Sequence, residues 1–111
     1  MSIYFDHAAT TPMVDAALNA LNTQLKKLGN ASSLHSAGRA VRKDLEAARE
    51  EIAHAINCAP SEVIFTATGT EANNLAIKGL YWKGVKENKR VIITSTFEHH
   101  AVMDPIVWLV E

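Results

Sequence analysis

The stretch Thr66-Ala67-Thr68-Gly69-Thr70-Glu71 decides how this sequence is interpreted, because it joins a strand-like segment to a helix-like one. Residues 62–66 are mainly β-branched or aromatic, which predicts a short buried strand. A helix is expected to start near Glu71. A turn of this kind leaves main-chain N–H groups free at the start of the helix, where the helix dipole also attracts anions. The turn is therefore a candidate phosphate site.

Two familiar nucleotide-binding motifs do not fit this turn. No Gly-Lys-Ser/Thr follows, which excludes a Walker loop, and only one glycine is present, which excludes the dinucleotide fingerprint. An ordinary turn with Thr70 as the helix N-cap is the alternative, since one glycine is a weak signal. Local spacing alone leaves both interpretations open.

A second buried strand is predicted over residues 90–95, and Glu98-His99-His100 follows it. Strand, helix and strand in this order form a βαβ unit with parallel strands, so an α/β fold is expected. Ligands of open α/β sheets bind at the carboxyl ends of strands, which makes His99 a candidate for ring stacking or proton transfer. Solvated imidazoles at a helix start are the alternative. Two strands are few for a parallel sheet, so the sheet is expected to be incomplete in this chain.

Apolar residues at helical spacing predict further helices over residues 12–28 and 37–57, and from Ala101 onward. Thr11 is the predicted N-cap of the first of these helices, Pro12 its first residue and Gly29 its stop. The polar and basic loop over residues 30–39 precedes the second. It is interpreted either as an anion or substrate contact or as a helix entry capped by Ser33 or Ser36.

Composition excludes several classes of function. The net charge of −1 gives no field that would draw the chain to nucleic acid or to a membrane surface. No apolar run is long enough to span a bilayer, and the N-terminal residues lack the pattern of a signal peptide. The single cysteine, Cys58, excludes a disulfide framework and a Cys-rich metal site, so no metal is expected and Cys58 is interpreted as a passive thiol. A cytoplasmic location is expected.

Taken in order, four blocks of the sequence resemble the cysteine desulfurases of the class-V aminotransferase family: Tyr4–Pro12, Asn30–Arg39, Phe65–Gly79 and Glu98–Val102. The resemblance implies a fold-type-I enzyme that uses pyridoxal 5'-phosphate (PLP), with an aspartate aminotransferase-like large domain in which helices flank a parallel sheet. It implies that residues 1–29 belong partly to a small domain and that residues 30–111 begin the PLP-binding domain. A homodimer is also implied.

The resemblance further implies which reaction and which residues to expect. The family converts L-cysteine to L-alanine and transfers the sulfur as an enzyme persulfide, which a sulfur-acceptor protein takes for iron–sulfur clusters or thiolation. By position, Gly69 and Thr70 would hold the PLP phosphate, and His99 would stack on the pyridine ring and assist proton transfer. The four residues implied to border the substrate cavity are Asp6, His7, Ala8 and Thr10.

Departures from the family pattern limit the expected activity. Thr68 stands where the family has a small residue, and Ala67 replaces a common serine. Neither Lys78 nor Cys58 matches the family's Schiff-base lysine or its catalytic cysteine, so this chain alone is expected to be an inactive N-terminal part of a longer enzyme.

Two rival interpretations remain open: another class-V member, such as a selenocysteine lyase or small-molecule aminotransferase, and a non-catalytic phosphate-binding or assembly module. The isolated chain is expected to self-associate through exposed apolar surface.

Overall fold

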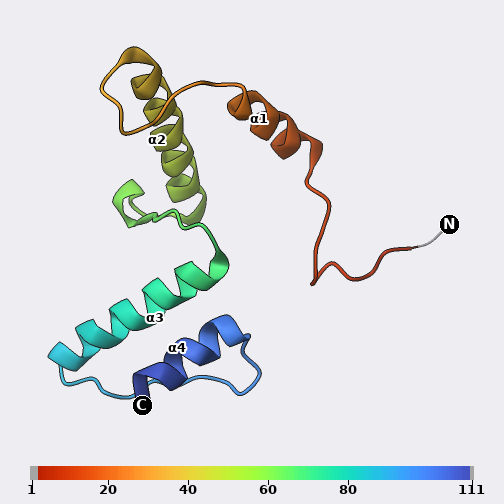
Figure 1. The fold of residues 1–111 in the computed structure, drawn as a ribbon. Helices are drawn as coiled ribbons and strands as arrows, with labels where there is room; N and C mark the ends of the chain where they lie inside the picture. The colour runs from red at the N-terminus through yellow and green to blue at the C-terminus, as the bar shows by residue number, and fades with distance from the viewer. Residues whose placement is uncertain (1–2, 111) are drawn as a thin grey trace. The chain divides into compact units, whose positions relative to one another are not determined.

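The computed structural model describes residues 3–110 (Figure 1), and these fall into two units, one ending at Val63 and the other beginning at Ile64. The elements in chain order are α1 (Asp15–Leu25), α2 (Ser36–Ile56), the 3-10 helix η1 (Pro60–Glu62), α3 (Gly69–Lys86) and α4 (His100–Val110). The domain division after Gly29 that the resemblance implies stays a prediction. Within residues 3–110, no helix has the length and apolar character needed to cross a membrane.

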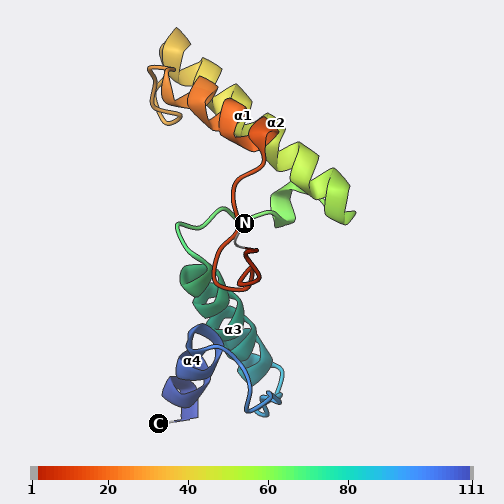
Figure 2. The same ribbon diagram turned by 90° about the vertical axis from the view of Figure 1, so that its right-hand side faces the viewer.

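In the first unit, α2 begins and ends on local hydrogen bonds. Nδ1 of His35 accepts from the amide of Gly38 at 3.3 Å, so His35 is the N-cap and the expected caps at Ser33 or Ser36 were wrong. At the other end Asn57 adopts a left-handed conformation (φ 55°), which lets the Cys58 amide donate to the carbonyl of Ala53 at 2.9 Å. The 3-10 helix η1 then folds back against α2 (Figure 2).

Helix α1 begins later and ends earlier than the sequence predicts. It starts at Asp15 instead of Pro12, and no side chain caps it, so Thr11 is not the N-cap. The preceding loop is held in its own turn, because the Tyr4 hydroxyl donates to the carbonyls of Asp6 (2.8 Å) and Thr10 (3.2 Å). The helix stops at Leu25, four residues before the predicted stop at Gly29.

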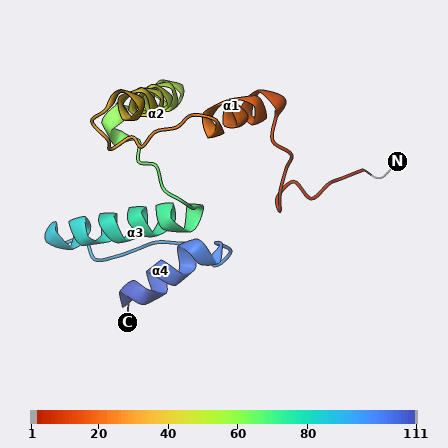
Figure 3. The same cartoon turned by 45° about the horizontal axis from the view of Figure 1, so that its top comes forward.

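In the second unit, α3 and α4 lie side by side and run in the same direction (Figures 1 and 3). Helix α3 continues past Gly84 to Lys86, and the left-handed Asn88 (φ 59°) ends it by directing the Lys89 amide to the Gly84 carbonyl at 2.8 Å. An extended segment then returns to the start of α4. Neighbouring helices that run the same way, joined by an extended return segment, are typical of alternating α/β folds.

The two predicted strands are not strands in the described part of the chain. Glu62 closes η1, and no strand is assigned to residues 63–66 or 90–95 in the described part of the chain. A strand needs hydrogen bonds from an adjacent strand, and these segments have none here, so residues 3–110 form no parallel sheet. Their apolar side chains stay open to solvent, as shown by Val91 (82% exposed) and Ile93 (94%).

Candidate functional site

The predicted phosphate turn lies at the start of α3, and two reciprocal hydrogen bonds hold it. Oγ1 of Thr68 accepts from the amide of Glu71 at 3.1 Å, and the Glu71 carboxylate accepts from the amide of Ala67 at 2.8 Å. Thr68 is therefore the N-cap in place of Thr70, because its extended backbone (φ −147°, ψ 159°) suits that position whereas Thr70 is already helical. The turn is fixed on both sides of Gly69.

Two donors at this turn have no acceptor within residues 3–110: the main-chain amides of Gly69 and Thr70. They lie at the positive end of an 18-residue helix. Apart from its two chain neighbours and the nearby backbone of α3, nothing lies within 4 Å of a Cβ built on Gly69, so no other part of the described chain fills the space beside it. The arrangement suits a phosphate, whose oxygens accept from main-chain N–H groups.

His99 directly precedes α4 and is tied to its first turn. Nδ1 of His99 accepts from the amide of Ala101 at 3.0 Å, and the His99 carbonyl accepts from the amides of Val102 (2.8 Å) and Met103 (3.1 Å). His99 is exposed, so its ring is available to a ligand. In the neighbouring residue His100, Nδ1 lies 3.4 Å from a carboxylate oxygen of Asp104.

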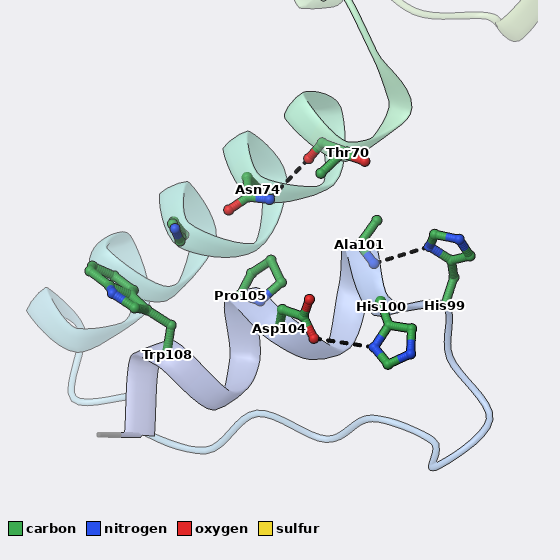
Figure 4. Close-up of a pocket in the computed structure, with 9 residues that line it drawn as sticks. Thr70, Asn74, His99, His100, Ala101, Asp104, Pro105 and Trp108 are labelled. Atoms are coloured by element: carbon green, nitrogen blue, oxygen red, sulfur yellow. Dashed lines mark hydrogen bonds and ion pairs between the residues drawn. The ribbon is translucent and has the colours of Figure 1, made fainter.

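A groove of about 420 Å³ lies between α3 and α4 and brings Thr70 and His99 to the same cavity (Figure 4). Helix α3 lines it with residues one turn apart, Thr70, Asn74 and Lys78. The residues from the α4 side are His99, His100, Ala101, Asp104, Pro105 and Trp108. The predicted phosphate contact and the predicted ring-stacking residue thus share one surface.

Sequence reasoning missed two residues that line this groove. Asn74 donates from Nδ2 to the carbonyl of Thr70 at 3.0 Å, which braces the first turn of α3. Trp108 lies under Lys78, whose Nζ is 4.2 Å from the centre of the indole ring. The helical spacing of Thr70, Asn74 and Lys78 was a usable signal for Asn74, whereas nothing local pointed to Trp108.

The loop residues predicted to border a substrate cavity, Asp6, His7, Ala8 and Thr10, belong to the other unit. They form a tight turn in which the amide of Ala9 donates to the carbonyl of Asp6 at 3.2 Å. The His7 ring meets the Tyr4 ring edge-on, with 5.2 Å between centroids. Their role at a substrate cavity stays a prediction.

Within residues 3–110, no group of three or more His, Cys, Asp and Glu side chains is placed to hold a metal ion. His100 and Asp104 form a pair only, and both are largely exposed. A pair of exposed side chains one helical turn apart is typical of a weak surface contact.

Residues 3–111 match the family described as aminotransferase class-V. Among curated proteins, the chain is 54% identical to the IscS-like cysteine desulfurase of Mycobacterium tuberculosis (strain ATCC 25618 / H37Rv), over 97% of this chain and 28% of that protein. It is 48% identical to the cysteine desulfurase IscS of Dictyoglomus turgidum (strain DSM 6724 / Z-1310), over 96% of this chain and 27% of that protein. The chain therefore spans little more than a quarter of the curated relatives it matches.

Among solved structures, a NifS-like protein superimposes with a TM-score of 0.84 at 34% sequence identity. The match covers 99% of this chain and 30% of the other. The path of the backbone therefore follows a portion of that protein's fold.

Proposed function

This chain belongs to the class-V aminotransferase family, and on that premise we propose that it forms part of a PLP-dependent cysteine desulfurase. The resemblance inferred from four sequence blocks is confirmed by the two relatives named cysteine desulfurase at 54% and 48% identity. The observation that carries the proposal is that Thr70, at the phosphate turn, and His99 line one groove. L-cysteine is the proposed substrate and L-alanine the proposed product, with the sulfur leaving as a persulfide.

The fold of the whole enzyme is proposed to include a parallel sheet that the described residues do not form. Residues 63–66 lead into α3, and residues 90–95 lead into α4. The two helices run in the same direction. Pairing between these segments and further strands would cover side chains such as Ile93. The TM-score of 0.84 to a NifS-like protein supports this arrangement.

The residues present fit the phosphate of PLP. The free amides of Gly69 and Thr70 point from the helix start, and the open space over Gly69 lets phosphate oxygens approach the main chain. The Thr70 hydroxyl adds a third donor. Thr68 is larger than the residue the family has there, and its Oγ1 accepts from the Glu71 amide as the cap of α3.

His99 is proposed to stack on the cofactor ring and to carry a proton during the reaction. PLP, when bound, supplies an electron sink that allows bonds of an amino-acid substrate to be broken. The residues of this chain are proposed to hold the phosphate through Gly69 and Thr70 and to orient the His99 ring against the cofactor ring. Asp6, His7, Ala8 and Thr10 are proposed to border the cavity that takes L-cysteine.

The wider setting is proposed from the family alone. We place the enzyme in the cytoplasm as a homodimer, with a sulfur-acceptor protein as its partner in iron–sulfur cluster assembly or thiolation. The chain by itself is expected to be inactive, because neither Lys78 nor Cys58 matches the family's Schiff-base lysine or its catalytic cysteine.

A binding experiment with matched glycine variants tests the phosphate site. Pyridoxine 5'-phosphate is the probe, because it lacks the aldehyde and cannot react with surface lysines. Binding is followed by quenching of Trp108 fluorescence in a Trp82→Phe background. Gly69→Val is expected to abolish binding, since its side chain would occupy the phosphate position.

The control is Gly79→Val, which places the same side chain in equally open space on the same helix and is expected to bind normally. Pyridoxine without its phosphate is expected to bind weakly to either protein. Equal affinity of the Gly69→Val and Gly79→Val proteins for pyridoxine 5'-phosphate would overturn the proposed site.

A further inference from the structure

The His99 ring has one nitrogen occupied by the protein itself. Nδ1 of His99 lies 3.0 Å from the main-chain nitrogen of Ala101, whose N–H can only donate. Nδ1 must therefore offer its lone pair, which places the proton of the neutral ring on Nε2. The same hydrogen bond satisfies an amide of the first turn of α4 that has no partner within the helix.

We propose that the first turn of α4 holds His99 as a neutral Nε2–H donor, with Ala101 acting as the positioning residue through its main-chain amide. In this tautomer Nε2 already carries its proton, so His99 can donate a hydrogen bond from Nε2, whereas it can take up a proton only at Nδ1, which would break the bond to Ala101. This placement does not require a bound cofactor. Its consequence for catalysis rests on the proposed function, in which the ring of His99 faces the cofactor.

The tautomer expected for His100, the next residue, can be compared with that of His99. Its Nδ1 faces a carboxylate oxygen of Asp104 at 3.4 Å, and a carboxylate only accepts. His100 is therefore biased toward the opposite tautomer, with the proton on Nδ1. The bias is modest, because both side chains are largely exposed (90% and 73%).

Nitrogen NMR of the whole chain without cofactor, at a pH where both rings are neutral, tests the proposal. We expect a scalar coupling across the hydrogen bond between the Ala101 amide nitrogen and Nδ1 of His99, and a single Nε2–H tautomer at His99. His100 is expected to show a larger Nδ1–H population, which Asp104→Ala lowers about twofold while leaving His99 unchanged.

Two variants of Ala101 separate the amide from the side chain. Ala101→Pro removes the N–H at a first-turn position where proline is tolerated, and is expected to abolish the coupling and let His99 sample both tautomers. Ala101→Gly keeps the N–H and is expected to keep the coupling. Absence of the coupling in the unmodified chain, or its survival in Ala101→Pro, would refute the proposal. If the coupling is present but pyridoxine 5'-phosphate does not bind, only the proposed function fails.

Discussion

The ammonium group of Lys78 on α3 lies over the indole ring of Trp108 on α4, with Nζ 4.2 Å from the ring centre. The contact joins the two helices at the end of the groove away from Thr70 and His99. The geometry is that of a cation–π contact.

Removing the charge of Lys78 is expected to loosen α4. Lys78→Met keeps most of the aliphatic stem but loses the cation–π attraction, which is worth about 0.5–1 kcal/mol at exposed sites. Hydrogen exchange of the α4 amides is expected to quicken accordingly. Lys78→Arg keeps a cation over the ring and serves as the control. Equal exchange in the Met and Arg variants would show that the contact does not stabilise the helix pair.

Substitutions at Thr68 and Thr70 are expected to have different effects, the first on the stability of α3 and the second on phosphate binding. Thr68→Ala removes the cap of α3 and is expected to cost about 1 kcal/mol of helix stability, which exchange of the Glu71 amide reports. Thr70→Ala is expected to leave that exchange unchanged and to weaken pyridoxine 5'-phosphate binding. Thr68→Ser, which keeps an accepting hydroxyl, is the matched control. The reverse pattern would place the phosphate contact at Thr68.

Asp44 of α2 is expected to titrate below the ordinary aspartate range. A hydrogen bond from Lys27 at 2.6 Å is the main cause that lowers the pKa of its carboxyl from the ordinary 3.8. Because the folded pKa is depressed, the ion pair contributes at neutral pH and is lost only as pH falls through that lowered value. Carbon NMR of the Asp44 carboxyl measures the midpoint.

Lys27→Gln is expected to raise the Asp44 midpoint toward 3.8, and Lys43→Gln to raise it less, since Lys43 acts only through its more distant charge. An unchanged midpoint in Lys27→Gln would mean that the ion pair does not persist in solution.

Self-association of the chain is expected, because large apolar side chains are exposed on the strand-like segments. Sedimentation velocity is expected to show larger species as concentration rises. Ile93→Lys is expected to reduce association more than Leu28→Lys, although both side chains are over 90% exposed, since Ile93 lies on the strand-like segment. A monomer at every concentration would contradict this prediction.

Features set by neighbouring residues were largely predictable. Helix α2 starts and ends within one residue of its predicted bounds, because the apolar periodicity that predicts it is local. The start of α3 was predicted within two residues. The choice of capping residue was wrong at Thr70 and Ser36 because several adjacent hydroxyls and a histidine compete, and backbone geometry selects among them.

Features that need a distant partner were predicted poorly. Residues 62–66 and 90–95 have the composition of buried strands, yet a strand exists only when another strand supplies its hydrogen bonds. The start of α1 shifted because the Tyr4 hydroxyl ties the preceding loop into its own turn. Neither outcome can be read from local spacing.

The family, the four main helices and the capped turn before α3 follow from the residues in chain order, because conformational preferences and hydrogen bonds act between close neighbours in the chain. The packing of α3 against α4 is what brings Thr70 and His99 to one groove and sets Lys78 over the Trp108 ring. Those contacts join residues far apart in the chain, so they depend on how α3 packs against α4, which no local pattern specifies.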